Sequence, residues 1–160
     1  MKSKPTTNID DKVGMYRQIV MNKLITSNKL YHIVCRDPKL TSGPELRWVN
    51  YFPMEYVPET QEDTKMFVCY DIKADYDPEN SCVQKLDIYF FISCNYLAMR
   101  DEQTGELRTD QAAHEIESIF TTTKLGFVHG KLIHNYPYAP ITKYRGRSIL
   151  ISFSDFSYGV

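Results

Sequence analysis

The chain has 160 residues, a formal net charge of −1 and 42% hydrophobic residues, a profile that indicates one folded domain rather than a disordered chain. Its near-zero charge excludes a general electrostatic attachment to DNA or to an anionic membrane. Twelve tyrosines and eight phenylalanines stand against one tryptophan. Because tyrosine joins a large apolar ring to a polar tip, this composition favours half-buried sheet faces and subunit interfaces.

The N-terminal segment 1–9 is polar and lacks the apolar core of a signal peptide, so we expect a flexible segment ahead of a single domain over 10–160. No apolar run approaches the ~20 residues that span a bilayer, and we therefore expect no membrane partner. The four cysteines are widely spaced and contain no C-x-x-C pair. That spacing predicts reduced thiols in a cytosolic setting, no zinc site and no cofactor.

Apolar residues recur at helical spacing over 10–26 and predict the first helix. The apolar segment 30–35 that follows fits either a strand or a second short helix.

Segment 37–63 contains four prolines, which forbid long regular elements, and four aromatic residues: Trp48, Tyr51, Phe52 and Tyr56. A long loop with so many rings is packed against something. One interpretation is that the rings pin the loop to its own domain. The other is that they form a contact arm for a neighbouring subunit.

Segments 65–73 and 84–94 alternate in hydrophobicity and predict an antiparallel hairpin. Tyr89 and Phe91 make the later half of the second strand apolar on both sides. Such a strand lies centrally in its sheet or is covered by something outside its own domain.

A helix that opens at Thr109 and two strands over 128–136 and 147–153 complete the chain. Together these elements predict an α+β fold: a single domain in which a mostly antiparallel sheet of about four to five strands packs against two helices.

The sequence has no glycine-rich phosphate loop, no nucleophile elbow and no metal-ligand spacing. Asp71 and Asp87 are placed to meet across the hairpin as an acid/base pair, or else to pair with the neighbouring Lys73 and Lys85. We favour the second interpretation and predict a protein that is not an enzyme.

The turn before the last strand is basic, with Lys143, Arg145 and Arg147 interleaved with Tyr138 and Tyr144. Cations and aromatic rings in this arrangement are typical of contacts to nucleic-acid phosphate, although charged turn residues are also often only solvated.

Five short segments carry a resemblance to a known family: YVPET at 56–60, LDIYFFI at 86–92, LRTD at 107–110, LGFVHGKL at 125–132 and YRGRSILI at 144–151. With the order helix, long proline-aromatic loop, hairpin, helix and two strands, the chain resembles the tail terminator and neck (head–tail connector) proteins of tailed bacteriophages. The resemblance covers most of the chain from about residue 11 onward.

The resemblance implies a tail-terminator-like structural protein of the virion, assembled in the host cytoplasm, whose copies form a ring, as a hexamer in tail terminators. Its partners would be the tail tube protein and the head-closing connector protein, and DNA would pass through the lumen. The alternatives are another neck ring, an adaptor or stopper, and a small nuclease-like enzyme.

The expected contact residues come from the aromatic loop, the hairpin and the basic turn. The candidate subunit interface comprises Trp48, Tyr51, Phe52, Tyr56, Tyr89, Phe91, Tyr144, Arg145 and Arg147. Lys143, Arg145 and Arg147 are the candidates for contact with DNA in the lumen. The hairpin tip over 75–81 is a further candidate contact.

Overall fold

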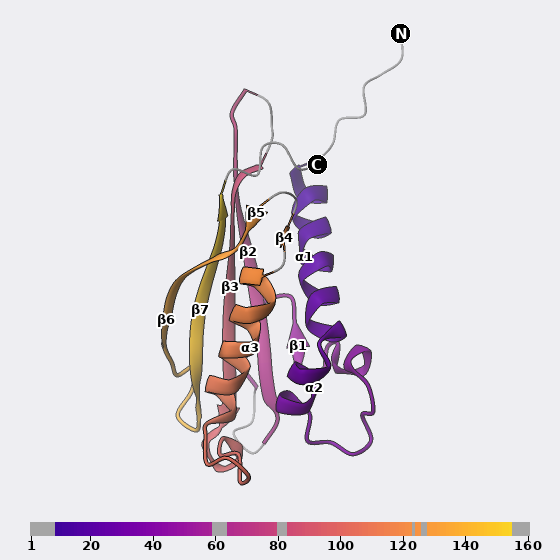
Figure 1. Cartoon of the computed structure of the whole chain (residues 1–160), viewed down its shortest axis with the longest axis vertical. Helices are drawn as coiled ribbons and strands as arrows, with labels where there is room; N and C mark the ends of the chain where they lie inside the picture. The colour runs from indigo at the N-terminus through magenta and orange to yellow at the C-terminus, as the bar shows by residue number, and fades with distance from the viewer. Residues whose placement is uncertain (1–8, 59–63, 80–82, 123, 126–127, 155–160) are drawn as a thin grey trace.

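The computed structural model describes residues 9–58, 64–79, 83–122, 124–125 and 128–154. Within this part of the chain a five-stranded sheet and three helices form a single α+β domain (Figure 1), which confirms the predicted fold class. The predicted N-terminal segment 1–9 lies outside the described residues except for its last position.

The strands of the main sheet follow the order β1-β2-β3-β7-β6. They are β1 (Tyr51–Phe52), β2 (Met66–Tyr76), β3 (Val83–Asn95), β7 (Tyr144–Ser154) and β6 (Lys131–Tyr138). Neighbouring strands are antiparallel except β1 and β2, which are parallel. The sheet is therefore mixed, because the segment that the prolines predicted to be irregular contributes a short strand of its own.

The helices are α1 (Ile9–Thr26), α2 (Asn28–Val34) and α3 (Arg108–Thr122). Figure 1 shows α3 in front of the sheet and α1 along the β2 side of it, at the right of the view, with α2 at the lower end of α1. α1 contacts β2, while α3 contacts β3 and β7. None of the helices in the described ranges has the length and apolar character needed to cross a membrane.

Short elements complete the chain. They are the 3₁₀ helices η1 (Gly43–Leu46) and η2 (Tyr96–Ala98), and the strands β4 (Lys124–Leu125) and β5 (Val128–His129), which pair with each other.

Segment 30–35 belongs to a helix rather than a strand. The Ser27 hydroxyl accepts a hydrogen bond from the Leu30 N–H at 3.2 Å, an N-cap from which α2 begins at Asn28. Leu30 and Val34, one helical turn apart, are both buried. The described residues therefore form three α-helices where the sequence predicted two.

The alternation along β2 separates two apolar clusters, as predicted. Met66, Val68 and Tyr70 belong to the main core on the helix side, whereas Phe67 and Cys69 belong to a smaller cluster on the outer face. The same alternation continues in β3, which is the middle strand of the sheet. Its central position accounts for the apolar residues on both of its sides.

Arg108, the first residue of α3, is only 2% exposed. Its Nε and Nη2 donate to the Ile33 carbonyl at 3.1 and 3.0 Å, and Nη2 also donates to the Val34 carbonyl at 3.0 Å. Its Nη1 donates to the Ala98 carbonyl at 2.7 Å. The last carbonyls of a helix lack intrahelical partners, so this guanidinium satisfies the end of α2 and joins it to α3.

Replacing Arg108 by Met should lower the free energy of unfolding by about 2–4 kcal/mol, because three carbonyls would stay buried without a donor. Urea unfolding followed by circular dichroism measures the change. The matched control is Arg100→Met, which removes an exposed guanidinium and should alter stability by no more than about 0.5 kcal/mol. Equal losses in the two variants would contradict the anchoring role of Arg108.

Candidate functional site

The predicted aromatic loop folds largely against its own domain. Tyr51 is fully buried in the main core, and Phe52, 8% exposed, lies in the outer cluster. Their side chains are thus internal to the subunit and present little surface to a neighbour. Of the two interpretations of this loop, pinning to the domain describes Tyr51 and Phe52.

After β1 the chain continues over the outer face of the sheet as a segment that we call the strap, residues 53–58. Tyr56 stacks on Phe52 with ring centroids 4.3 Å apart and packs against Phe67 at 5.3 Å. Glu55 accepts a hydrogen bond of 2.5 Å from the Tyr138 hydroxyl of β6, the opposite edge strand. Burial, followed by this hydrogen bond, raises the pKa of Tyr138. The strap therefore covers the part of the outer face that contains Phe52, Phe67 and Tyr138.

Trp48 is the exception among the loop aromatics, because its side chain is 58% exposed. Its backbone has a φ of 58°, in the left-handed region that a bulky residue rarely adopts. The Trp48 N–H donates to the Tyr51 carbonyl at 2.9 Å, and its ring meets Phe52 edge-on at 6.0 Å. Trp48 therefore remains a predicted contact residue on the surface.

Tyr89 and Phe91 on β3 are half-buried on the outer face. The Phe91 ring packs against Tyr138 at 5.4 Å, so its cover comes from within the same chain. Tyr89 lies between Asp71 of β2 and Leu150 of β7 in the sheet register, outside the outer cluster. Both are predicted interface residues, and of the two only Phe91 belongs to the outer cluster.

The predicted basic turn is the beginning of β7, and its residues have different environments. Tyr144 is fully buried in the outer cluster, while Lys143 and Arg145 are exposed. The Arg145 Nη1 donates to the carbonyls of Ile141 at 2.9 Å and Tyr144 at 2.8 Å. These bonds hold the guanidinium of Arg145 at the start of the strand.

Arg147 is committed to internal contacts. Its Nε donates to Asn135 Oδ1 at 2.6 Å, its Nη2 donates to the Asn135 carbonyl at 2.9 Å, and Asp110 of α3 lies 4.0 Å from Nε. The predicted cluster of three cations is thus reduced to Lys143 and Arg145 at the surface. The role of these two in contacting DNA stays a prediction.

Asp71 and Asp87 do not meet across the hairpin, so the structure does not support the acid/base alternative that the sequence analysis disfavoured. Asp71 lies opposite Tyr89, and Asp87 lies opposite Lys73, so the two carboxylates are offset in the hairpin. Each is also occupied by its own partner. They form no acid/base pair.

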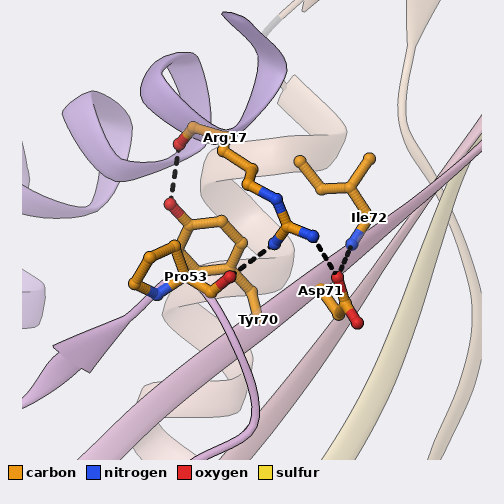
Figure 2. Close-up of polar contacts among 5 residues, drawn as sticks. All are labelled: Arg17, Pro53, Tyr70, Asp71 and Ile72. Carbon is orange, nitrogen blue, oxygen red and sulfur yellow. Dashed lines mark hydrogen bonds and ion pairs between the residues drawn. The ribbon is translucent and has the colours of Figure 1, made fainter. Parts of the chain in front are cut away.

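Asp71 belongs to a junction between α1 and the sheet, shown in Figure 2. Its Oδ1 accepts hydrogen bonds from Arg17 Nη2 at 2.7 Å and from the Ile72 N–H at 2.8 Å. Arg17 Nη1 donates to the Pro53 carbonyl, and the Arg17 carbonyl accepts a 2.6 Å hydrogen bond from the Tyr70 hydroxyl. Burial raises the pKa of Tyr70 to about 12, so the hydroxyl remains a donor. Asp71 thus helps to fasten α1 where β1 ends.

Asp87, on the outer face, is 4% exposed. It accepts a hydrogen bond from the Ser152 hydroxyl at 2.6 Å and pairs with Lys85 Nζ at 3.4 Å, as predicted for Lys85. In the described ranges no group of three or more His, Cys, Asp or Glu side chains is placed to hold a metal ion. The described carboxylates that the sequence singled out therefore have structural partners.

Sequence reasoning missed a groove of about 1490 Å³ between α2 and the beginning of α3. Its third wall is the loop 99–107. Gln111 Nε2 holds that loop by donating to Asp101 at 3.2 Å, Thr104 at 3.2 Å and Glu106 at 3.1 Å. Gly105 turns the loop with a φ of 76°. The Gly in a short polar loop was the only sequence signal for this built wall.

A second missed surface is the outer edge of β6. This strand pairs with β7 on one side, and no strand of the described residues pairs with it on the other. Ile133 and Tyr136 on it are 52% and 62% exposed. The sequence predicted the strand, but the sheet order that makes it an edge is a tertiary property.

These features define a single-domain α+β protein with three accessible features: Trp48, the β6 edge and the α2–α3 groove. The chain belongs to the YomW family, whose sequence model matches residues 19–153. This family is phage-derived and of the Bacillus prophage type, which indicates a phage-associated protein. No curated protein matches the chain.

Replacing Glu55 by Ala should loosen the strap, because the Tyr138 hydroxyl would lose its acceptor. The expected cost is about 0.5–1.5 kcal/mol of local stability. Hydrogen exchange measured by mass spectrometry should then be faster for peptides covering 53–58 and unchanged for peptides of α3. Glu102→Ala, which removes an exposed carboxylate elsewhere, serves as the control. Unchanged exchange in the strap of the Glu55 variant would contradict this account.

Proposed function

We propose that this protein is a structural component of a tailed-phage virion, whose copies form a ring at the head–tail junction. The ring would terminate the tail tube and join it to the head-closing connector. The observation that carries the proposal is the uncovered edge of β6. Membership of a phage-derived family supports the setting.

An edge strand leaves one row of backbone N–H and C=O groups unpaired, and such a row can receive a strand from another chain. In β6 the accessible stretch lies between a register shift at Leu132/His134 and Pro137, which has no N–H to donate. Ile133 and Tyr136 add exposed apolar surface to the same strand. A short, bounded edge of this kind favours a defined contact with a neighbour over open-ended aggregation.

In the proposed ring Lys143 and Arg145 are the residues available for DNA in the lumen, because Arg147 is committed to Asn135. A tail terminator predicts a hexamer. Another ring of the neck, an adaptor or a stopper, would use the same kind of subunit contacts but contain a different number of subunits. Native mass spectrometry of the purified full chain distinguishes the two by counting subunits.

The double variant Ile133→Lys/Tyr136→Lys should be missing from purified phage particles, because charged side chains oppose burial of the β6 edge. The measurement is immunoblotting of purified particles after complementation with the variant gene. The matched control is Met15→Lys, which changes an apolar residue of α1 that is 37% exposed. Circular dichroism must give the wild-type spectrum for both variants.

Two results would contradict the proposed ring protein. The first is a wild-type chain that is strictly monomeric and absent from purified virions. Normal incorporation of the β6 double variant would remove the observation on which the proposal rests.

A further inference from the structure

The outer edge of β6 has the features of an acceptor for an added strand. In Figure 1 β6 forms the left border of the sheet, on the side opposite α1. His134 and Tyr136 stack with ring centroids 4.5 Å apart, and Tyr136 is 62% exposed. They lie on the same face of β6 as Tyr138, because side chains two positions apart on a strand share a face. An aromatic surface therefore adjoins the edge, where the side chains of an added strand would lie beside it.

Backbone groups at the opposite edge of the sheet are already occupied within the chain. The Tyr51 carbonyl of β1 accepts a hydrogen bond from the Trp48 N–H at 2.9 Å. On β2, the Ile72 N–H donates to the Asp71 carboxylate at 2.8 Å. Pairing β6 of one copy with this edge of the next copy would compete with both hydrogen bonds. A strand from another part of the chain meets no such competition.

The residues that follow the described part of β7 have the sequence pattern of a strand. Residues 155–160 read DFSYGV, in which Phe156, Tyr158 and Val160 alternate with small residues. Aromatic and β-branched residues are the types that strands favour. In extended form these six residues match the length of the β6 stretch 133–138, because each residue of a strand adds about 3.3 Å.

This segment can cover little of the β6 edge of its own subunit. β7 ends at Ser154, beside the start of β6, because Ser152 lies opposite Lys131. Reaching the far side of β6 means crossing two strand spacings, about 10 Å, which takes about three extended residues. The residues that remain would extend only to about Ile133 and would miss the ring of Tyr136. On a second copy the whole segment is available for pairing.

We propose that residues 155–160 of one copy add as a strand to the β6 edge of the next copy. Phe156 and Tyr158 lie beside the stacked rings of β6. In such strand addition backbone hydrogen bonds supply the affinity, and alternate side chains supply the selectivity.

The proposed contact joins unlike parts of two copies. Because each copy carries both the segment and the edge, the contact is head-to-tail, and it generates a ring when the rotation between copies closes. The inference rests on the proposed ring and names the two parts that join one copy to the next.

Two variants of the full chain separate the donor from the acceptor. Phe156→Lys/Tyr158→Lys blocks the segment and keeps β6, whereas Ile133→Lys/Tyr136→Lys blocks the edge and keeps the segment. In analytical ultracentrifugation each variant alone should have a dissociation constant at least about tenfold higher than the wild type, because charges replace apolar anchors. Mixing the two should give a dimer with one copy of each variant, because an intact segment then meets an intact edge.

Two further variants serve as controls. Phe156→Tyr/Tyr158→Phe keeps both rings and should assemble within about threefold of the wild type. A chain with all four lysine substitutions lacks both parts and should dimerise with neither blocked variant. Circular dichroism must give the wild-type spectrum for every variant.

Each result supports or overturns the contact. A dimer in the mixture supports it, and such a dimer cannot arise from two misfolded chains. A mixture without a dimer, or a Phe156→Lys/Tyr158→Lys variant that assembles like the wild type, overturns this contact. The proposed ring then still stands if the β6 variant is lost from virions, with a strand of another protein on the edge. A wild-type chain that is monomeric at every concentration and missing from virions overturns both.

Discussion

The structure depends most on one buried cation. The hydrogen-bond acceptors of the Arg108 guanidinium among the described residues are backbone carbonyls of α2 and η2, and none of them is a carboxylate. Burial is the main cause that lowers the pKa of Arg108, yet a guanidinium keeps its charge in proteins. The positive side chain of Arg108 compensates the negative C-terminal end of the α2 dipole. It thereby holds together α2 and α3, two helices that are distant in sequence. The groove exists because this joint holds its two helical walls together.

The outer face shows how a single chain limits its own exposed apolar surface. A sheet in which only one face is packed by helices normally leaves the other to water, with polar side chains. Here the strap covers Phe67, and Tyr144 fills the same cluster. Outside this cluster the outer face carries exposed polar residues such as Asp71 and Lys73, as expected for a solvated face. Large apolar side chains that remain exposed include Ile133 and Tyr136 on β6, Leu97 and Leu107 in the groove, and Trp48, Met54 and Tyr96 elsewhere.

Most of the strands and helices could be predicted from apolar residues that recur with strand or helix spacing. The faces of β2, the central position of β3 and the helices α1 and α3 follow from local alternation and capping, which the printed sequence contains. The burial of Tyr51 could not be predicted in this way, because it results from a parallel pairing with Val68 that no local sequence pattern encodes. The same holds for Arg108 and Arg147, whose sequence context is that of ordinary surface arginines. Their partners, Ile33 and Asn135, come from other elements.

For the candidate contact residues, too, the sequence could not show which side chains are buried and which are exposed. An aromatic residue in a proline-rich loop is equally suited to a core and to an interface, so Phe52 and Trp48 could not be separated by composition. Their exposures differ because the backbone at Trp48 turns into the left-handed region and directs the next residues into β1. Hydrophobic character identified the loop; only the turn geometry decides which ring meets solvent.

The β6 edge and the α2–α3 groove belong to different parts of the fold. β6 runs along one side of the subunit, whereas α2 and the loop before α3, which line the groove, lie at one end of its long axis (Figure 1). A strand edge offers backbone hydrogen bonds to a partner strand, and the exposed side chains of Ile133 and Tyr136 can add selectivity to such a contact. Because the two surfaces are separate, a partner on one of them leaves the other accessible.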